Sequence, residues 1–209
     1  MYIVIEGQDG TGKSTQVELL AERLKKTGKE VLTFHEPDGD LEAAHAMRAI
    51  IKDKKYNLEP MTHVMLFTAA RYELWKKLAE PVLKRGGYVI SARNWWSTLA
   101  YQGYGQGVSK SRITRLTKEV MPEPYVKPDK AVILTLDDAE RHKRQAGRDE
   151  THGADTTTKT DTFESKSDDF QQKVNHAYLA IAKELGIKML DASGTIDEVS
   201  SSLLELGIV

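Results

Sequence analysis

The chain of 209 residues contains no cysteine. Without thiols it can form neither a disulfide framework nor a metal site with thiolate ligands. No apolar run approaches the roughly 18–20 residues of a membrane-spanning helix. The opening segment MYIVIE is too short for a signal peptide and lacks its basic flank. From these absences we expect a cytoplasmic protein that does not enter a membrane.

An excess of charge of either sign is also missing. The 30 lysines and arginines nearly balance the 31 aspartates and glutamates, which leaves a formal net charge of −1. Because proteins that bind nucleic acids usually carry a strongly basic surface, no nucleic-acid partner is expected. The hydrophobic fraction of 40% is enough for a core, and the length suits a single domain over residues 1–209.

Short apolar segments alternate with amphipathic ones along the chain. The apolar runs predict strands over residues 2–5, 30–34, 88–92, 130–136 and 187–190. Helical spacing predicts helices from the glycine loop to Gly28, up to about Asp53, and over roughly 61–84, 170–185 and 195–206. This alternation indicates an α/β fold with a parallel sheet, in which ligands bind beyond the carboxyl ends of the strands. The stretch 147–163 has almost no apolar residues and is predicted to be a mobile loop.

A glycine-rich segment, GQDGTGKST at residues 7–15, follows the first predicted strand and precedes a predicted helix. It matches the phosphate-binding pattern G-x-x-x-x-G-K-[ST], in which backbone N–H groups and the helix N-terminus hold phosphate oxygens. Lys13 would reach the β- and γ-phosphates and Ser14 would bind Mg²⁺, whereas the alternative is a simple glycine turn capped by Ser14. The predicted ATP-binding residues are Gly7, Gly10, Thr11, Gly12, Lys13, Ser14 and Thr15.

A phosphate-binding loop alone does not distinguish a kinase from a GTPase, a motor or a transporter subunit. The guanine-specific pattern N-K-x-D is absent, and a chain of this length has little room for motor machinery. A small kinase remains, so the question becomes which group accepts the phosphate.

Six segments, taken in order, resemble the motifs of the thymidylate kinase (dTMP kinase) family. They are YIVIEGQDGTGKSTQ (2–16), FHEPDGD (34–40), MLFTAARYEL (65–74), ARNWWSTLAYQG (92–103), PEPYVKPDKAVILTLD (122–137) and DTFESKSDDFQQKVNHAYLAIA (161–182). The resemblance implies ATP-dependent phosphorylation of dTMP to dTDP with Mg²⁺, by a homodimer. It also implies a three-layer P-loop fold, with a five-stranded parallel sheet, helices on both faces and a mobile lid near 144–164.

The resemblance also assigns an acceptor site. Phe67 and Arg71 are four residues apart and share one helix face, and in the family this pair holds the thymine. Arg93 matches the arginine that contacts the acceptor phosphate, and Tyr101 matches a tyrosine beside the sugar. The full predicted set is Asp9, Glu36, Pro37, Phe67, Arg71, Arg93, Ser97, Thr98, Tyr101 and Gln102. The competing interpretations are core packing for Phe67 and Tyr101, ordinary ion pairs for both arginines, and a solvated loop charge for Glu36.

Catalysis of phosphoryl transfer depends mainly on positioning and on neutralising negative charge. The resemblance gives this work to Lys13, Asp9 and Arg93. Family members place a further arginine either in the P-loop or in the lid, and here position 11 is threonine. Arg144 or Arg148 at the start of the lid is therefore the candidate closing arginine, although both would also suit a solvated helix face.

The chain departs from the family pattern at several positions. Ala92 replaces an aspartate that supports the Mg²⁺ shell, His35 and Thr162 stand where arginines are usual, and Asn94-Trp95-Trp96 replaces the usual aromatic start of its segment. These changes leave two alternatives open, a kinase for another or modified deoxypyrimidine monophosphate such as dUMP, or a catalytically impaired nucleotide-binding homologue. A deoxynucleoside kinase is less favoured, because the arginine expected to bind the acceptor phosphate is present.

Overall fold

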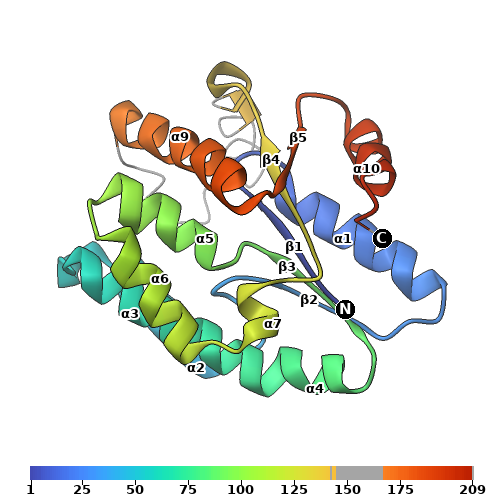
Figure 1. The fold of residues 1–209 in the computed structure, drawn as a ribbon, viewed down its shortest axis with the longest axis horizontal. Helices are drawn as coiled ribbons and strands as arrows, with labels where there is room; N and C mark the ends of the chain where they lie inside the picture. The colour runs from blue at the N-terminus through green and yellow to red at the C-terminus, as the bar shows by residue number, and fades with distance from the viewer. Residues whose placement is uncertain (142, 145–166, 209) are drawn as a thin grey trace.

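The computed structural model describes residues 1–141, 143–144 and 167–208. Within them, five strands form one parallel sheet in the order β2-β3-β1-β4-β5 (Figure 1). The strands are β1 (Tyr2–Gly7), β2 (Val31–His35), β3 (Tyr88–Ala92), β4 (Lys130–Thr135) and β5 (Lys188–Asp191). Each lies where the sequence predicted a strand, so the predicted five-stranded parallel sheet is confirmed.

The helices follow the predicted order, with a short 3₁₀ turn and one longer helical region added. They are α1 (Lys13–Lys26), α2 (Glu42–Lys52), the 3₁₀ turn η1 (Lys54–Tyr56), α3 (Pro60–Leu74), the π-helical turn η2 (Trp75–Ala79), α4 (Glu80–Lys84), α5 (Trp95–Thr98), the π-helical turn η3 (Leu99–Gly105), α6 (Lys110–Val120), α7 (Glu123–Val126), α9 (Asp168–Leu185) and α10 (Ile196–Glu205). Apolar periodicity did not predict the helical region from α5 to α7. The predicted helix over 61–84 is interrupted by η2, because Pro81 has no N–H to donate to the preceding turn.

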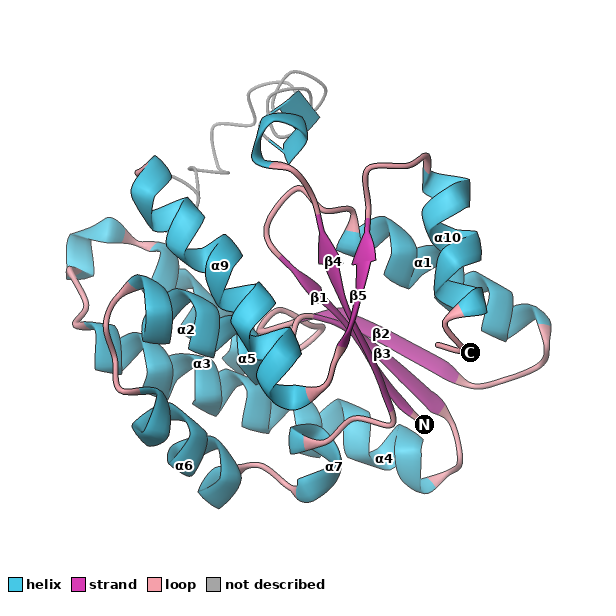
Figure 2. Cartoon of the chain, turned by 45° about the horizontal axis from the view of Figure 1, so that its top comes forward, coloured by secondary structure: helices cyan, strands magenta, loops and turns pink. Residues whose placement is uncertain are grey.

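The sheet is covered by helices on both faces, as predicted (Figure 2). Side chains alternate between the faces of a strand. Ile3 and Ile5 therefore pack with α1 and α10 in one cluster, while Tyr2 and Val4 pack in a second cluster with helices α3 to α9. None of the helices within the described residues is long and apolar enough to span a bilayer.

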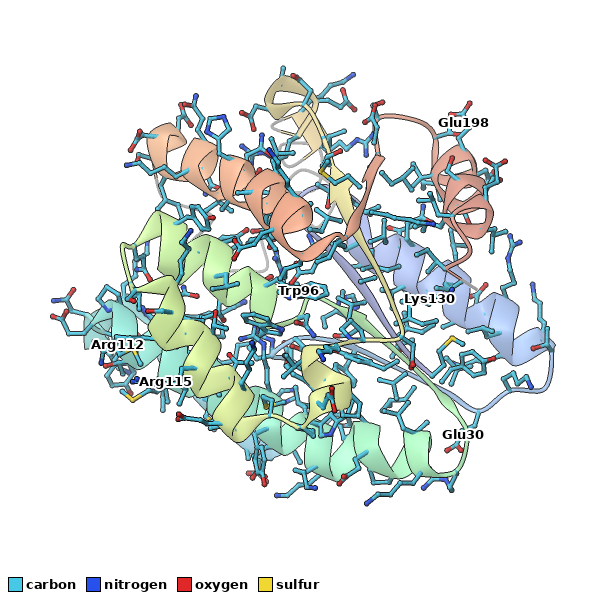
Figure 3. The ribbon with its side chains drawn as sticks, viewed as in Figure 1. Glu30, Trp96, Arg112, Arg115, Lys130 and Glu198 are labelled. Carbon is cyan, nitrogen blue, oxygen red and sulfur yellow. The ribbon has the colours of Figure 1, made fainter. Side chains whose placement is uncertain are left out.

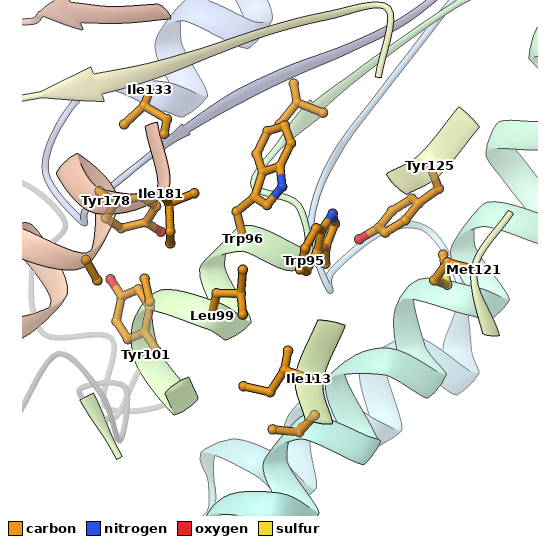
Figure 4. Close-up of a cluster of buried hydrophobic side chains, with 14 of the residues drawn as sticks. Trp95, Trp96, Leu99, Tyr101, Ile113, Met121, Tyr125, Ile133, Tyr178 and Ile181 are labelled. Carbon is orange, nitrogen blue, oxygen red and sulfur yellow. The ribbon is translucent and has the colours of Figure 1, made fainter. Parts of the chain in front are cut away.

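The second cluster is rich in aromatic side chains (Figure 4). Trp75 meets the rings of Tyr2 and Tyr125 edge-on, with centroids 5.1 and 5.4 Å apart, and Trp96 lies in the interior of the molecule (Figure 3). Ring pairs of this geometry add to the free energy of burial. This face of the sheet therefore gives the loops above it a rigid base.

The carboxyl ends of the neighbouring strands β2, β3 and β1 lie side by side. Ala92 of β3 is in register with Ile5 of β1 and with His35 of β2. The phosphate-binding loop, Glu36 and Arg93 directly follow these strand ends, so the parallel register brings them to one edge of the sheet. The predicted lid, residues 144–164, lies outside the described residues except for Arg144.

Candidate active site

The glycine-rich loop joins β1 to α1 and folds back on itself. Lys13 Nζ donates to the carbonyl oxygen of Gln8 at 2.7 Å, and Thr11 Oγ1 donates to the same oxygen at 2.9 Å. Gly12 has φ 85°, a conformation that favours glycine. A Cβ atom at Gly7 would collide with the carbonyl oxygen of Leu134. The glycines of the loop are therefore required for its shape, and its polar residues supply its chemistry.

Two adjoining pockets surround this loop. Six of the seven predicted ATP-binding residues line them, namely Gly10, Thr11, Gly12, Lys13, Ser14 and Thr15. Gly7 does not; it sits at the end of β1, where its carbonyl oxygen accepts a hydrogen bond from Arg93. The second pocket extends along the β5–α10 loop past Gly194 and Thr195.

Arg93 is held in a strained conformation at the end of β3. Its φ is 79°, which is unusual for a residue with a side chain. Its guanidinium pairs with the carboxylate of Asp9 and donates to Ser97 Oγ and Tyr178 OH at 3.1 and 3.3 Å. Because these contacts hold Arg93 in a strained conformation, its guanidinium has a fixed position in the site.

Tyr101 completes this arrangement from the other side of Asp9. Its hydroxyl donates to the carboxylate of Asp9 at 2.8 Å. Burial and the negative charge of Asp9 raise the pKa of Tyr101 well above its usual value, so the hydroxyl remains a donor at neutral pH.

Glu36 lies at the centre of a second buried network. Its carboxylate accepts from Arg71 Nε at 2.8 Å, Tyr125 OH at 2.6 Å and Tyr2 OH at 3.2 Å, and only 2% of the residue is exposed. Burial raises the pKa of Glu36 to about 7, against the opposing effects of Arg71 and Tyr125. Neither a solvated loop charge nor a surface ion pair describes this arrangement.

Arg71 links this network to the base side of the site. Its Nη1 donates to Thr98 Oγ1 at 2.7 Å, and its guanidinium lies 5.3 Å from the centre of the Phe67 ring. The arginine is 3% exposed and is therefore fixed in position by its partners. The planar group and the aromatic ring together form one wall of a cavity.

One pocket brings together the whole predicted acceptor set. It is lined by Asp9, Glu36, Pro37, Phe67, Arg71, Arg93, Ser97, Thr98, Tyr101 and Gln102, and also by Arg48. Sequence reasoning missed Arg48, which also borders the phosphate-loop pocket. The available signal was its spacing in α2, because Arg48 falls on the same helical stripe as the buried Ala44 and Ile51.

A fully buried acid, Glu6, was also missed. Its carboxylate accepts from the backbone N–H groups of Asn94 and Ser97 at 2.7 and 3.1 Å and from Tyr178 OH at 3.1 Å. It thus fixes the start of α5 beside Arg93. A lone acid at the end of the apolar run YIVI was the signal for it.

Comparisons with known proteins agree with this geometry. The family model described as thymidylate kinase matches residues 5–203. The chain belongs to the thymidylate kinase family. It is 34% identical to the thymidylate kinase of Nitrosospira multiformis, over 97% of this chain and 94% of the relative. It is 32% identical to that of Chlamydia trachomatis serovar L2, over 99% and 98%.

A solved structure of the same family is also similar. The crystal structure of thymidylate kinase from Ehrlichia chaffeensis superposes with a TM-score of 0.74 at 28% identity, and covers 99% of this chain and 97% of that one. The predicted family and fold class are therefore confirmed. The comparisons do not test the individual site residues, whose roles stay predictions.

Two of the departures from the thymidylate kinase pattern, His35 and Ala92, meet at one corner of the phosphate-loop pocket. His35 Nδ1 lies 3.2 Å from Ser14 Oγ, and both His35 and Ala92 line this pocket. Partial burial lowers the pKa of His35, and the charge of Glu18 opposes this effect. Among the described residues, no group of three or more acids, histidines or cysteines could hold a metal ion. A cation at Ser14 would therefore depend on phosphate oxygens for most of its ligands.

Of the two candidate closing arginines, the structure describes one. Arg144 lines both pockets around the phosphate loop, while its Nε donates to Glu140 at 3.0 Å and its Nη2 to the carbonyl of Ser193 at 3.3 Å. Arg148 lies outside the described residues. Arg144 is thus already beside the phosphate loop.

Proposed function

We propose that this member of the thymidylate kinase family transfers the γ-phosphoryl group of ATP to the phosphate of dTMP, which yields dTDP. One observation carries the assignment. The pocket around the phosphate loop and the pocket of the acceptor set share Asp9, Glu36, Arg48 and Arg93 as lining residues. A nucleotide in each pocket would bring the two sets of phosphates together beside Arg48 and Arg93, and in-line transfer requires such proximity and neutralisation of charge.

The acceptor pocket suits a pyrimidine nucleotide. Phe67 offers a flat apolar surface to a base, and the Nε2 group of Gln102 is buried with no hydrogen-bond partner among the described residues. A buried donor without a partner is costly, and a carbonyl oxygen on the base edge would satisfy it. Tyr101 lies next to Asp9, where a sugar would pass between base and phosphate.

Transfer itself requires charge neutralisation more than proton removal, because the acceptor phosphate is already ionised. Lys13 would release the Gln8 carbonyl and bind the β- and γ-phosphates, Arg93 would bind the acceptor phosphate, and Arg144 or Arg148 would close over the donor. Ser14 would hold Mg²⁺, which offsets charge on the phosphate oxygens. The hydroxyl at Ser14 and the open pocket beside it fit such an ion.

We also infer that the enzyme acts as a homodimer in the cytoplasm. The support for a dimer is a set of exposed large hydrophobic side chains on α2 and α3, namely Ile50, Met65 and Tyr72. Met65 and Tyr72 are two turns apart on one helix face, a pattern typical of helix-to-helix contacts. The molar mass in solution, measured by light scattering, tests the dimer, and a mass of 23.4 kDa would overturn it.

The decisive experiment is an acceptor panel assayed with ATP and Mg²⁺. It compares dTMP, dUMP, dCMP, dGMP and thymidine, with formation of each diphosphate, or of dTMP from thymidine, followed by chromatography. We expect dTMP to give the highest kcat/KM and thymidine to give no product. A higher kcat/KM for another monophosphate would overturn the choice of acceptor, and binding of both substrates without turnover would overturn the enzymatic assignment.

A further inference from the structure

The corner formed by Ser14, His35 and Ala92 has a donor chemistry that is unusual for a magnesium site. Magnesium prefers oxygen ligands, and one or two carboxylates are the usual protein contribution. Here the polar group nearest to the Ser14 hydroxyl is an imidazole nitrogen, Nδ1 of His35, at 3.2 Å. The position opposite His35 in the sheet register is Ala92, which has no donor.

The carboxylates that line this pocket are already engaged. Asp9 pairs with Arg93 and Tyr101, Glu36 is held by Arg71 and two tyrosine hydroxyls, and Asp38 pairs with His45 and Arg48. Recruiting any of them to a cation would break an existing ion pair.

The spacing of the two donors fits adjacent positions of an octahedral cation. Ligands about 2.1 Å from a metal and at right angles to each other lie about 3.0 Å apart. The Ser14–His35 separation of 3.2 Å is close to this value. His35 is an exposed residue that lines the pocket, so an incoming metal–nucleotide complex can reach its ring.

We propose that His35 Nδ1 joins Ser14 Oγ as a ligand of the metal ion that enters with the nucleotide. An imidazole ligand would shift the metal preference of this site from Mg²⁺ toward Mn²⁺ and the later divalent transition ions. Glu18 stands four residues after Ser14 in α1 and is close enough to His35 to act on the ring electrostatically, and acids commonly orient metal-bound histidines in this way. The inference rests on the proposed binding of a nucleotide at the phosphate loop.

The test uses Mn²⁺ as a spin probe, bound together with β,γ-methylene ATP and dTMP to the full chain. Pulsed electron paramagnetic resonance detects a nitrogen bonded directly to Mn²⁺ by its modulation of the spin echo. We expect a ¹⁴N modulation in the unlabelled protein that changes to the ¹⁵N pattern when histidine alone is labelled with ¹⁵N. The labelling excludes the adenine nitrogens of the nucleotide and needs no mutation.

Two variants locate the nitrogen. The modulation should disappear in His35→Gln and persist in His45→Gln, whose imidazole pairs with Asp38 but does not line the pocket. The ratio of Mn²⁺ to Mg²⁺ affinity in the nucleotide complex should fall about tenfold or more in His35→Gln, the scale on which the surroundings of a metal ligand act. No histidine-derived modulation in the unmutated chain would overturn the proposal.

Nucleotide affinity measured by calorimetry on the same samples separates this proposal from the one on which it rests. If the nucleotide binds and the histidine label has no effect, His35 only hydrogen-bonds Ser14 and the metal proposal fails alone. If the nucleotide does not bind, the proposed function and the metal proposal are both overturned.

Discussion

The acceptor pocket and the phosphate-loop pocket meet at shared residues but are built differently. In the acceptor pocket, polar side chains are held by one another, as Glu36 is by Arg71 and Tyr125 and as Asp9 is by Arg93 and Tyr101. In the phosphate-loop pocket, the key groups contact neutral partners, with Lys13 on the Gln8 carbonyl and Ser14 on the His35 ring.

The difference shows how preorganisation is divided between the two substrates. Buried ion pairs fix the acceptor side before any ligand arrives, so little reorganisation is needed when dTMP binds. The donors of the phosphate loop instead exchange one neutral partner for a phosphate oxygen. Mutations should therefore affect folding on the acceptor side and turnover on the phosphate side.

The largest effect is expected when Arg71 is replaced by methionine. The substitution leaves Glu36 buried without its cationic partner, and breaking such a pair costs about 3–5 kcal/mol. Chemical denaturation should show this loss in the free energy of unfolding. The matched control is the exposed pair that Arg85 forms with Glu30, and Glu30 lies at the edge of the molecule (Figure 3). Arg85→Met should leave stability nearly unchanged, because water screens that pair.

A double variant sharpens this prediction. Arg71→Met combined with Glu36→Gln removes both charges, so it should be more stable than Arg71→Met alone. Equal stability of the single and double variants would show that the unpaired acid is not the source of the loss.

Replacement of Lys13 by alanine should lower turnover and leave stability nearly unchanged, the reverse of the effect expected for Arg71→Met. Because Lys13 would stabilise charge that develops during transfer, kcat should fall about 10²- to 10³-fold. The free energy of unfolding and the affinity for dTMP should change little, since Lys13 does not line the acceptor pocket. Lys26→Ala in the same helix is an exposed control and should keep full activity. An unchanged kcat in Lys13→Ala would remove the phosphate loop from the mechanism.

The pH dependence of stability should also report on the acceptor side. With a pKa of about 7 in the folded state against 4.5 as the reference, Glu36 binds its proton more tightly when folded. Its contribution to stability is therefore fully present below about pH 4.5. Between that pH and about pH 7, the contribution of Glu36 to the free energy of unfolding falls by about 1.4 kcal/mol per pH unit. The free energy of unfolding, plotted against pH, should therefore follow different slopes for the unmutated chain and for Glu36→Gln across this window. Parallel curves would mean that Glu36 is ionised throughout.

The sequence was a good guide to the fold and to the phosphate loop because both depend on local patterns. A strand, a glycine turn and a helix are encoded within residues 2–26, and the apolar runs of the other strands are continuous. The acceptor set was predicted through family resemblance, since nothing local connects Phe67 with Tyr101 or Asp9.

The sequence did not predict the hydrogen bonds between segments that lie far apart in the chain. Glu6 binds the start of α5, and Tyr2 and Tyr125 meet at Glu36. These contacts depend on strand register and on the rotamers of buried side chains, which a periodic pattern does not specify. The closeness of His35 to Ser14 likewise follows from the pairing of β3 with both β2 and β1.

The smallest predicted effect comes from restoring a carboxylate at the end of β3. Ala92 lines the phosphate-loop pocket beside His35, so Ala92→Asp would add an oxygen donor and a negative charge near the metal. The Mg²⁺ concentration for half-maximal rate should fall by a few fold, and more than the corresponding Mn²⁺ concentration, because a carboxylate is a ligand that Mg²⁺ prefers. Ala92→Asn has nearly the same shape without the charge and should not produce this shift. If Ala92→Asp folds and changes neither concentration, the metal does not depend on this corner of the phosphate-loop pocket, and the two pockets differ only in how their side chains are held.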